Sequence, residues 1–111
     1  PEDVTRRLLE TRGLSPFLTG IACSDSAPGR RLSKAEMLGL LAERHGVAAE
    51  HAIMVGDSVF DMRGGREAGM DTAAVLYGYG RREALLETEP DFVVEDAAWT
   101  RISRRRQPRC L

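Results

Sequence analysis

The chain has 111 residues, of which 42% are hydrophobic and 30% charged, and its formal net charge is −1. This length suits one domain, and this composition predicts a folded globular protein and excludes a disordered one. The small net charge gives no general attraction for nucleic acid or for an anionic membrane, so any partner must be recognised at a local site.

Neither the cysteines nor the apolar segments indicate an exported protein. Cys23, in an apolar stretch, and Cys110, beside the end, do not make a disulfide framework. No apolar run approaches the ~20 residues of a transmembrane helix, and no signal-peptide pattern opens the chain. We therefore expect a cytoplasmic protein that does not span a membrane. Because the first residue is Pro1 rather than Met, we also expect a processed chain or a piece of a longer one.

The N-terminal quarter is expected to hold a helix and a strand. Over residues 3–12 apolar side chains recur at helical spacing, and Gly13 supplies the stop. The apolar run "LTGIACS", residues 18–24, is bounded by Pro16 on one side and by the polar stretch "SDSAPG" on the other. This run predicts a short strand followed by a loop.

The stretch "SKAEMLGLLAERHG", residues 33–46, predicts the clearest helix of the chain. Ser33 and Glu36 have the spacing of a capping box, and Gly46 ends the helix. Lys34 falls in the first turn, so this side chain is expected near the helix N-terminus.

Strands and helices alternate over the second half of the chain. The run "AIMV", residues 52–55, lacks polar alternation, as expected for a parallel strand that is covered on both faces. Further elements are predicted as a helix at 59–68, a strand at 71–78, a short helix at 81–87 and a last strand from 90 to 94. This alternation predicts the α/β class.

Two carboxylates follow the strand at residues 52–55, in "GDSVFD". Ligands of open α/β sheets bind beyond the carboxyl ends of the strands, which places Asp57 and Asp61 where a site is expected. Two hard oxygen ligands suit Mg²⁺, which takes one or two carboxylates together with phosphate oxygens and waters. Lys34, at a helix N-terminus, can offer a positive charge to a phosphate. The combination indicates a phosphorylated ligand.

Each of these residues also has a structural interpretation. An Asp pair four residues apart is commonly a helix cap and a solvated carboxylate, and a lone lysine in a first turn is commonly a surface residue. Tyr77 and Tyr79 in "YGYG" can line a substrate entrance, or their glycine neighbours can simply form a turn after a strand. The strand end, the acidic pair and the lysine together favour a functional role for Lys34, Asp57 and Asp61.

Two segments, "RRLSKAEML" and "VGDSVFDM", carry a resemblance to a known family. Together with the looser run "REAGMDTAAVLYGYGRREALLETEPDFVV", they resemble the second half of a haloacid dehalogenase (HAD) superfamily phosphatase of the phosphoglycolate phosphatase-like kind. The resemblance covers residues 1–99. It implies an α/β fold with a partial Rossmann-like parallel sheet flanked by helices, which lacks the nucleophile strand and the cap.

The resemblance implies a role for each site residue. Asp57 would be a direct Mg²⁺ ligand, and Asp61 a second ligand or a partner of metal-bound water. Lys34 would steady the nucleophile and the phosphoryl group of a small phosphorylated metabolite, and Ser58 would make a minor contact with the phosphate. The implied reaction is hydrolysis of a phosphate monoester through an aspartyl-phosphate, with Mg²⁺ as the cofactor.

The family's nucleophile is missing from this chain. In the family an aspartate of a D-x-D motif attacks phosphorus, and this sequence contains no D-x-D. We therefore expect a fragment that begins just after the family's second motif and is inactive alone. Its sheet is expected to have a gap, whose exposed apolar faces and backbone edges predict poor stability or self-association. An N-terminal half would then supply the nucleophile.

The last segment, residues 100–111, is polar and strongly basic. Its arginines are Arg101, Arg104, Arg105, Arg106 and Arg109. Because no aromatic residues are interleaved with them, we expect a solvated, disordered tail rather than a nucleic-acid site. The predicted organisation is thus part of one core domain at residues 1–99 and a tail at 100–111.

Two alternatives to a phosphatase stay open. The absent nucleophile is compatible with a non-catalytic remnant that binds a partner or a phosphate ligand. Another reaction of the superfamily, that of a phosphomutase or a dehalogenase, is also compatible, because the residues that select the substrate usually belong to a cap that this chain lacks.

Overall fold

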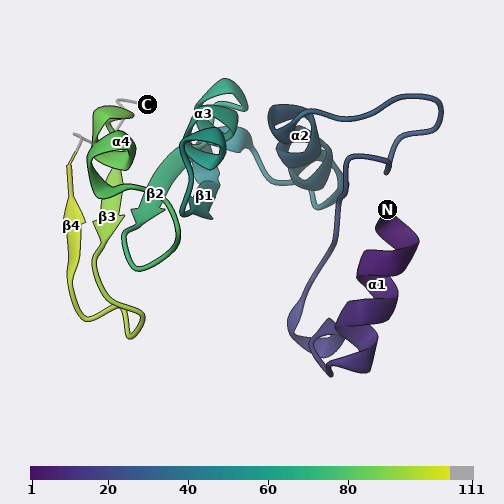
Figure 1. Cartoon of the computed structure of the whole chain (residues 1–111). Coiled ribbons are helices and arrows are strands. Elements are labelled where there is room, and N and C mark those ends of the chain that lie inside the picture. The colour runs from purple at the N-terminus through teal and green to yellow at the C-terminus, as the bar shows by residue number, and fades with distance from the viewer. Residues whose placement is uncertain (106–111) are drawn as a thin grey trace.

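The structure is a computed structural model that describes residues 1–105 (Figure 1). Its helices are α1 (Glu2–Thr11), η1 (Ser15–Phe17), α2 (Lys34–Arg44), η2 (Ala49–His51), α3 (Val59–Glu67) and α4 (Arg82–Glu87), of which η1 and η2 are 3-10 helices. Its strands are β1 (Ile53–Gly56), β2 (Asp71–Val75), β3 (Phe92–Val94) and β4 (Ile102–Arg104). The predicted α/β alternation from residue 52 to residue 94 is confirmed. None of the described helices is long and apolar enough to cross a lipid bilayer.

The four strands form one mixed sheet in the order β1-β2-β3-β4. β1 is parallel to β2, with Ile53 opposite Asp71, and β2 is parallel to β3, with Ala73 opposite Phe92. Parallel neighbours need crossovers, which α3 and α4 provide. β4 pairs with β3 in the antiparallel direction. The carboxyl ends of β1, β2 and β3 therefore lie along one edge of the sheet.

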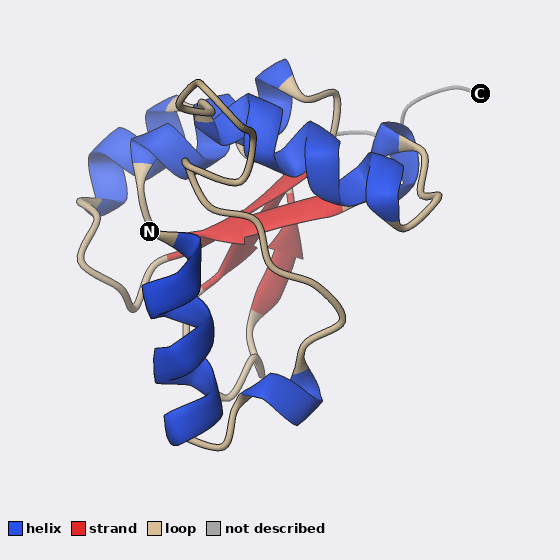
Figure 2. Ribbon diagram, turned by 90° about the vertical axis from the view of Figure 1, so that its right-hand side faces the viewer, coloured by secondary structure: helices blue, strands red, loops and turns tan. Residues whose placement is uncertain are grey.

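The core lies where the helices pack on the sheet. α2, α3 and α4 lie side by side along one side of the strands (Figures 1 and 2). Met62 of α3, Ala74 of β2 and Leu85 of α4 form a buried cluster. α3 approaches the sheet closely, because a Cβ at Gly65 would lie 2.7 Å from the Cβ of Met54. A glycine that is unfavourable in a helix interior thus permits close packing here.

The strand predicted at residues 18–24 is wrong. These residues form an extended connection between η1 and α2, and no strand of the described chain pairs with them. Their backbone groups bond outside any sheet: Cys23 N–H donates to the Ser26 hydroxyl at 2.8 Å, Leu32 N–H donates to the Ser24 carbonyl at 2.6 Å, and the Arg44 guanidinium donates to the Ile21 carbonyl at 3.5 Å. An apolar run becomes a strand only where a neighbouring strand completes the ladder of hydrogen bonds.

Strand β4 lies within the segment that was expected to be a disordered tail. Ile102–Arg104 pair with β3, and the Arg104 guanidinium lies 5.5 Å from the centre of the Phe92 ring. This cation–π contact and the antiparallel ladder order a basic stretch whose composition alone indicates solvation. The expectation is therefore wrong for Ile102–Arg104, whereas Arg106, Arg109 and Cys110 lie outside the described residues.

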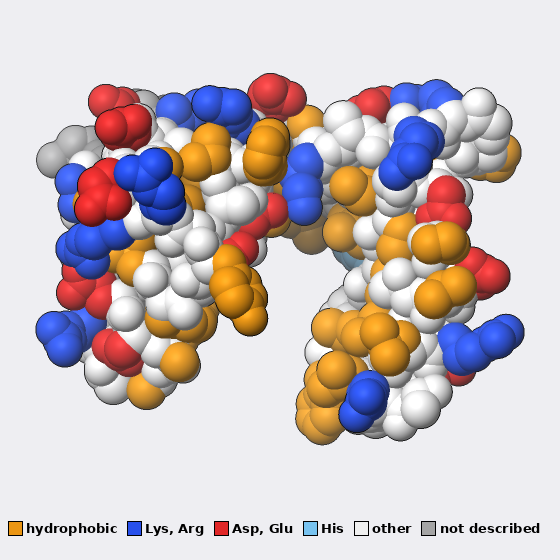
Figure 3. Space-filling model, viewed as in Figure 1, with side chains coloured by type: hydrophobic (Ala, Val, Ile, Leu, Met, Phe, Trp, Pro, Cys, Tyr) orange, Lys and Arg blue, Asp and Glu red, His pale blue; other side chains and the backbone are white. Residues whose placement is uncertain are grey.

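The edge of the sheet at β1 is open. β1 pairs only with β2 among the described strands, and its Ile53 and Val55 side chains are 53% and 44% exposed. The expectation that both faces of this strand are covered is therefore wrong for the described chain. α1 lies apart from the sheet (Figure 1). A deep hollow with hydrophobic side chains on its walls lies between α1 and the sheet (Figure 3).

Candidate functional site

The connection from β1 to α3 places two carboxylates at the carboxyl end of the sheet. Asp57 directly follows β1, and Ser58 is the N-cap of α3. The Ser58 backbone N–H donates to Asp61 Oδ2 at 3.2 Å, and the Asp61 backbone N–H donates to the Ser58 hydroxyl oxygen at 3.1 Å. This capping box turns Asp61 back toward the strand end. Gly56 leaves room for it, because a Cβ there would overlap the Asp61 carboxylate.

Lys34 reaches this position from a different element. It is the only lysine of the chain, and it opens α2 directly after the capping residue Ser33. Its aliphatic stem crosses α3 at Gly64, where a Cβ would overlap the Lys34 Cγ. The Lys34 Nζ lies 3.1 Å from Asp61 Oδ1. The fold therefore joins Lys34 and Asp61 in an ion pair, although 27 positions of sequence separate them.

The Asp61 carboxylate is held in its ionised form. Burial raises the pKa of Asp61, but the hydrogen bond and positive charge of Lys34 and the donors of Ser58 lower it by more. The pKa of Asp61 therefore lies below its ordinary value. Both oxygens of this carboxylate accept hydrogen bonds, Oδ1 from Lys34 and Oδ2 from Ser58.

Asp57 is held by a backbone group that the sequence did not reveal. Oδ2 of Asp57 accepts a hydrogen bond of 3.0 Å from the backbone N–H of Tyr79, in the loop between β2 and α4. A Cβ at Gly78 would overlap the same carboxylate, so the loop can approach Asp57 only with glycine at this position. The glycines of "YGYG" were a signal for this contact, but the sequence does not show which residue they approach.

The acidic pair fits a Mg²⁺ ion that takes most of its ligands from water or substrate. Among the described residues, Oδ1 of Asp57 accepts no hydrogen bond and can serve as a ligand, whereas Asp61 is shared with Lys34 and Ser58. No group of three or more His, Cys, Asp or Glu residues within residues 1–105 could enclose a metal ion. Such a donor set is compatible with Mg²⁺, which often binds one or two carboxylates and retains several waters.

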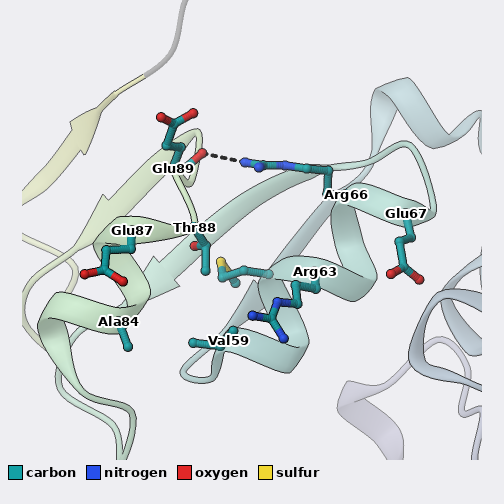
Figure 4. A pocket seen from close by; sticks show the side chains of 9 residues that line it. Val59, Arg63, Arg66, Glu67, Ala84, Glu87, Thr88 and Glu89 are labelled. Atoms are coloured by element: carbon teal, nitrogen blue, oxygen red, sulfur yellow. Dashed lines mark hydrogen bonds between the residues drawn. The ribbon is translucent and has the colours of Figure 1, made fainter.

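The tyrosine side chains do not point into a described cavity. The hydroxyl of Tyr77 accepts a hydrogen bond of 2.9 Å from the indole N–H of Trp99, and the side chain of Tyr79 is fully exposed. A pocket of about 570 Å³ does occur between α3 and α4, lined by Met62, Arg63 and Glu87 among others (Figure 4). Neither the acidic pair nor Lys34 lines this pocket, so it is separate from the candidate site.

The chain is similar to known proteins over most of its length. Residues 31–100 match the HAD-hydrolase-like family model. The chain is similar to the phosphoglycolate phosphatases of Vibrio cholerae, at 32% identity over 86% of this chain and 42% of that protein, and of Agrobacterium fabrum, at 35% identity over 82% and 38%. It thus spans about two fifths of the length of these curated relatives.

Solved structures show the same likeness. A haloacid dehalogenase-like family hydrolase from Streptococcus pneumoniae superposes with a TM-score of 0.70 at 32% identity, over 79% of this chain and 40% of that one. A structure from Clostridium difficile has a TM-score of 0.72 at 32% identity, over 83% and 43%. With its acidic pair at the end of β1 and the family model matched over residues 31–100, this chain belongs to the HAD-hydrolase-like family.

Proposed function

We propose that this chain is the C-terminal part of the core of a Mg²⁺-dependent phosphatase that hydrolyses a small phosphate monoester. The observation that carries the proposal is the 3.1 Å ion pair of Lys34 and Asp61 next to Asp57, at the carboxyl end of β1. Phosphoryl transfer depends mainly on positioning and on neutralising charge on the phosphoryl oxygens. The relatives named phosphoglycolate phosphatases support a small phosphorylated metabolite as substrate.

In this proposal each side chain of the cluster has a separate task. Asp57 and Asp61 hold the Mg²⁺ ion, which neutralises phosphate charge when it is bound. Lys34 keeps Asp61 ionised and offers its ammonium group to a phosphoryl oxygen. Ser58 holds Asp61 through the capping box and makes a minor contact with the phosphate. The backbone N–H of Tyr79 orients the Asp57 carboxylate.

The nucleophile comes, in the same proposal, from an N-terminal half. The sequence has no D-x-D motif, and β1 presents an edge that no described strand pairs with. The exposed Ile53 and Val55 of β1 offer an apolar surface on which further chain can pack. The 111 residues alone are therefore expected to release no phosphate.

The test measures Mg²⁺-dependent phosphate release from p-nitrophenyl phosphate by this chain, with and without the N-terminal part of the Vibrio cholerae relative added in trans. We expect no release by the chain alone and Mg²⁺-dependent release by the mixture. Asp57→Asn in this chain should abolish that release. Activity of the chain alone that is lost in Asp57→Asn would show that the site is complete without an N-terminal half.

A second candidate function is a non-catalytic module that binds a phosphate-bearing ligand or partner. The absence of a third carboxylate beside Asp57 and Asp61 among the described residues favours it. This candidate predicts no recovered hydrolysis in trans, while inorganic phosphate still shifts the NMR signal of the Lys34 ammonium group. Because Lys34 is the only lysine of the chain, that signal is unambiguous.

A further inference from the structure

The β2–α4 loop, residues 76–81, closes over Asp57 with its backbone. The Tyr79 N–H donates to Asp57 Oδ2 at 3.0 Å. A Cβ at Gly78 would overlap the Asp57 carboxylate, and a Cβ at Gly80 would overlap the Asp57 carbonyl oxygen. The loop therefore contacts Asp57 at both its side chain and its main chain. What fixes the loop also fixes the direction in which the free Asp57 oxygen points.

A side-chain contact ties this loop to a distant part of the chain. The indole Nε1–H of Trp99 donates to the Tyr77 hydroxyl at 2.9 Å, across 22 positions of sequence. Both side chains are partly exposed, at 41% and 46%, so this bond lies at the surface rather than in the core. Tyr77 precedes by one residue the glycine that touches Asp57. The bond is therefore placed to restrain the loop rather than to build the core.

Trp99 is itself held by a turn between β3 and β4. Its backbone N–H donates to the Asp96 carbonyl at 3.0 Å, and its φ of +57° lies in the left-handed region. The Asp96 carboxylate accepts from the Thr100 backbone N–H at 3.0 Å, from the Thr100 hydroxyl at 2.7 Å and from the Arg101 N–H at 3.1 Å. Four donors thus bind one aspartate, and the turn that carries the indole is well defined.

We propose that Trp99 and Tyr77 are positioning residues for Asp57: their hydrogen bond fixes the β2–α4 loop, whose Tyr79 N–H in turn orients the Asp57 carboxylate. The proposal deepens the proposed function, because it rests on that function for what Asp57 does. How Asp57 is held is a separate matter that can be measured without metal or substrate. Neither Trp99 nor Tyr77 is expected to touch a substrate.

The test follows hydrogen exchange of the Tyr79 amide by NMR in the metal-free 111-residue chain. Tyr77→Phe and Trp99→Phe each remove the bond and keep an aromatic ring. We expect each to speed exchange of the Tyr79 amide by about 2- to 10-fold, the change expected from one hydrogen bond. The buried Ala74 amide in β2 should exchange at an unchanged rate. The double variant should be no faster than either single variant, because both remove the same bond.

Tyr79→Phe is the matched control. It deletes the same hydroxyl two residues away, from a side chain that is fully exposed and whose hydroxyl has no described partner. Its Tyr79 amide should keep the parent exchange rate after correction for residue type. An unchanged rate in both Tyr77→Phe and Trp99→Phe would overturn the proposal, and so would an equal acceleration at Ala74, which indicates general destabilisation.

A Mg²⁺ titration separates this proposal from the proposed function. In the parent chain MgCl₂ should shift the Tyr79 and Gly78 amide signals, and Tyr77→Phe should weaken the apparent affinity by about 2- to 10-fold. If Mg²⁺ shifts neither signal in the parent chain, the metal role of Asp57 is wrong. The exchange rates then still decide whether Trp99 and Tyr77 position that residue.

Discussion

The Lys34 ammonium and the Asp61 carboxylate form a pair of unequal exposure, because the Lys34 side chain is 42% exposed and the Asp61 side chain 14%. Ion pairs that reach solvent contribute little to stability, typically about 0.2–1 kcal/mol. The pair is therefore poorly explained as a device for folding. Lys34 is the only lysine among the 16 lysine and arginine residues of the chain. A lysine at this position is better explained by a role for its compact ammonium charge, which a flexible side chain carries.

Replacing Lys34 by methionine is predicted to raise the pKa of Asp61. The folded-state pKa is depressed, so the carboxylate contributes stability that is present above its unfolded pKa and is lost as pH falls through the folded value. Without Lys34, the stability that is lost on acidification below about pH 4 should be smaller. Carbon-detected NMR titration of Asp61 and urea unfolding at several pH values measure both effects. An unchanged Asp61 titration in Lys34→Met would contradict the ion pair.

At the scale of single elements, short-range chemistry explains most of the boundaries. α2 and α3 both begin with a serine whose hydroxyl accepts the N–H of the third helical residue, and both have the reciprocal carboxylate. The sequence predicted the capping box of Ser33 and Glu36, because a glutamate at this spacing is the usual partner of the capping serine. In α3 the partner is Asp61, so one carboxylate serves both the cap and the candidate site.

Ser58→Ala is predicted to destabilise the chain by about 1 kcal/mol, because the Asp61 N–H loses its acceptor at the start of α3. Ser58→Thr keeps a hydroxyl at the same place and should retain most of that stability. Urea denaturation of the three proteins measures the difference. Equal stability of the alanine and threonine variants would mean that the capping bond contributes nothing.

The start of β2 is held by a buried carboxylate rather than by backbone alone. Asp91 Oδ2 accepts the Thr72 backbone N–H at 2.8 Å, and both residues are buried. Asp91→Ala leaves that buried N–H without its acceptor and should cost about 2–3 kcal/mol. Asp3→Ala removes a carboxylate from the exposed face of α1 and should change stability by less than about 0.5 kcal/mol. Thermal unfolding of both variants checks the contrast.

At the scale of the whole molecule, apolar side chains are exposed along the open edge at β1. Ile53 and Val55 are exposed on the open edge strand, and Phe17 of η1 is 83% exposed. Exposed strand edges with apolar side chains favour pairing between molecules. The open edge at β1 is therefore the surface that the proposed N-terminal half would cover.

The chain alone is therefore predicted to self-associate, and Ile53→Lys should weaken that association by at least about tenfold, because a charge on an edge strand opposes pairing. Ile102→Lys is the matched control: Ile102 is 52% exposed on β4, at the opposite edge of the sheet. Sedimentation velocity over a range of concentrations measures both. A parent chain that stays monomeric at 100 μM, a concentration of order 10⁻⁴ M at which even weak pairing is populated, contradicts the prediction.

The sequence by itself determined the features that depend on neighbouring residues. Helical spacing with a capping box predicted α2, and an apolar run that ends in glycine and aspartate predicted β1 and the place of the acidic pair. The resemblance carried by Lys34, Asp57 and Asp61 also led to the right family. These patterns succeed because hydrogen bonds within a helix and the end of a strand involve residues only a few positions apart.

Only the tertiary structure decided what depends on residues far apart in the sequence. The apolar run at 18–24 and the run at 52–55 look alike, yet within residues 1–105 only the second has a neighbouring strand to complete its ladder. The ion pair between Lys34 and Asp61 and the Tyr79 bond to Asp57 each join separate elements. Such contacts follow from how α2, α3 and the sheet pack together, which no local pattern encodes.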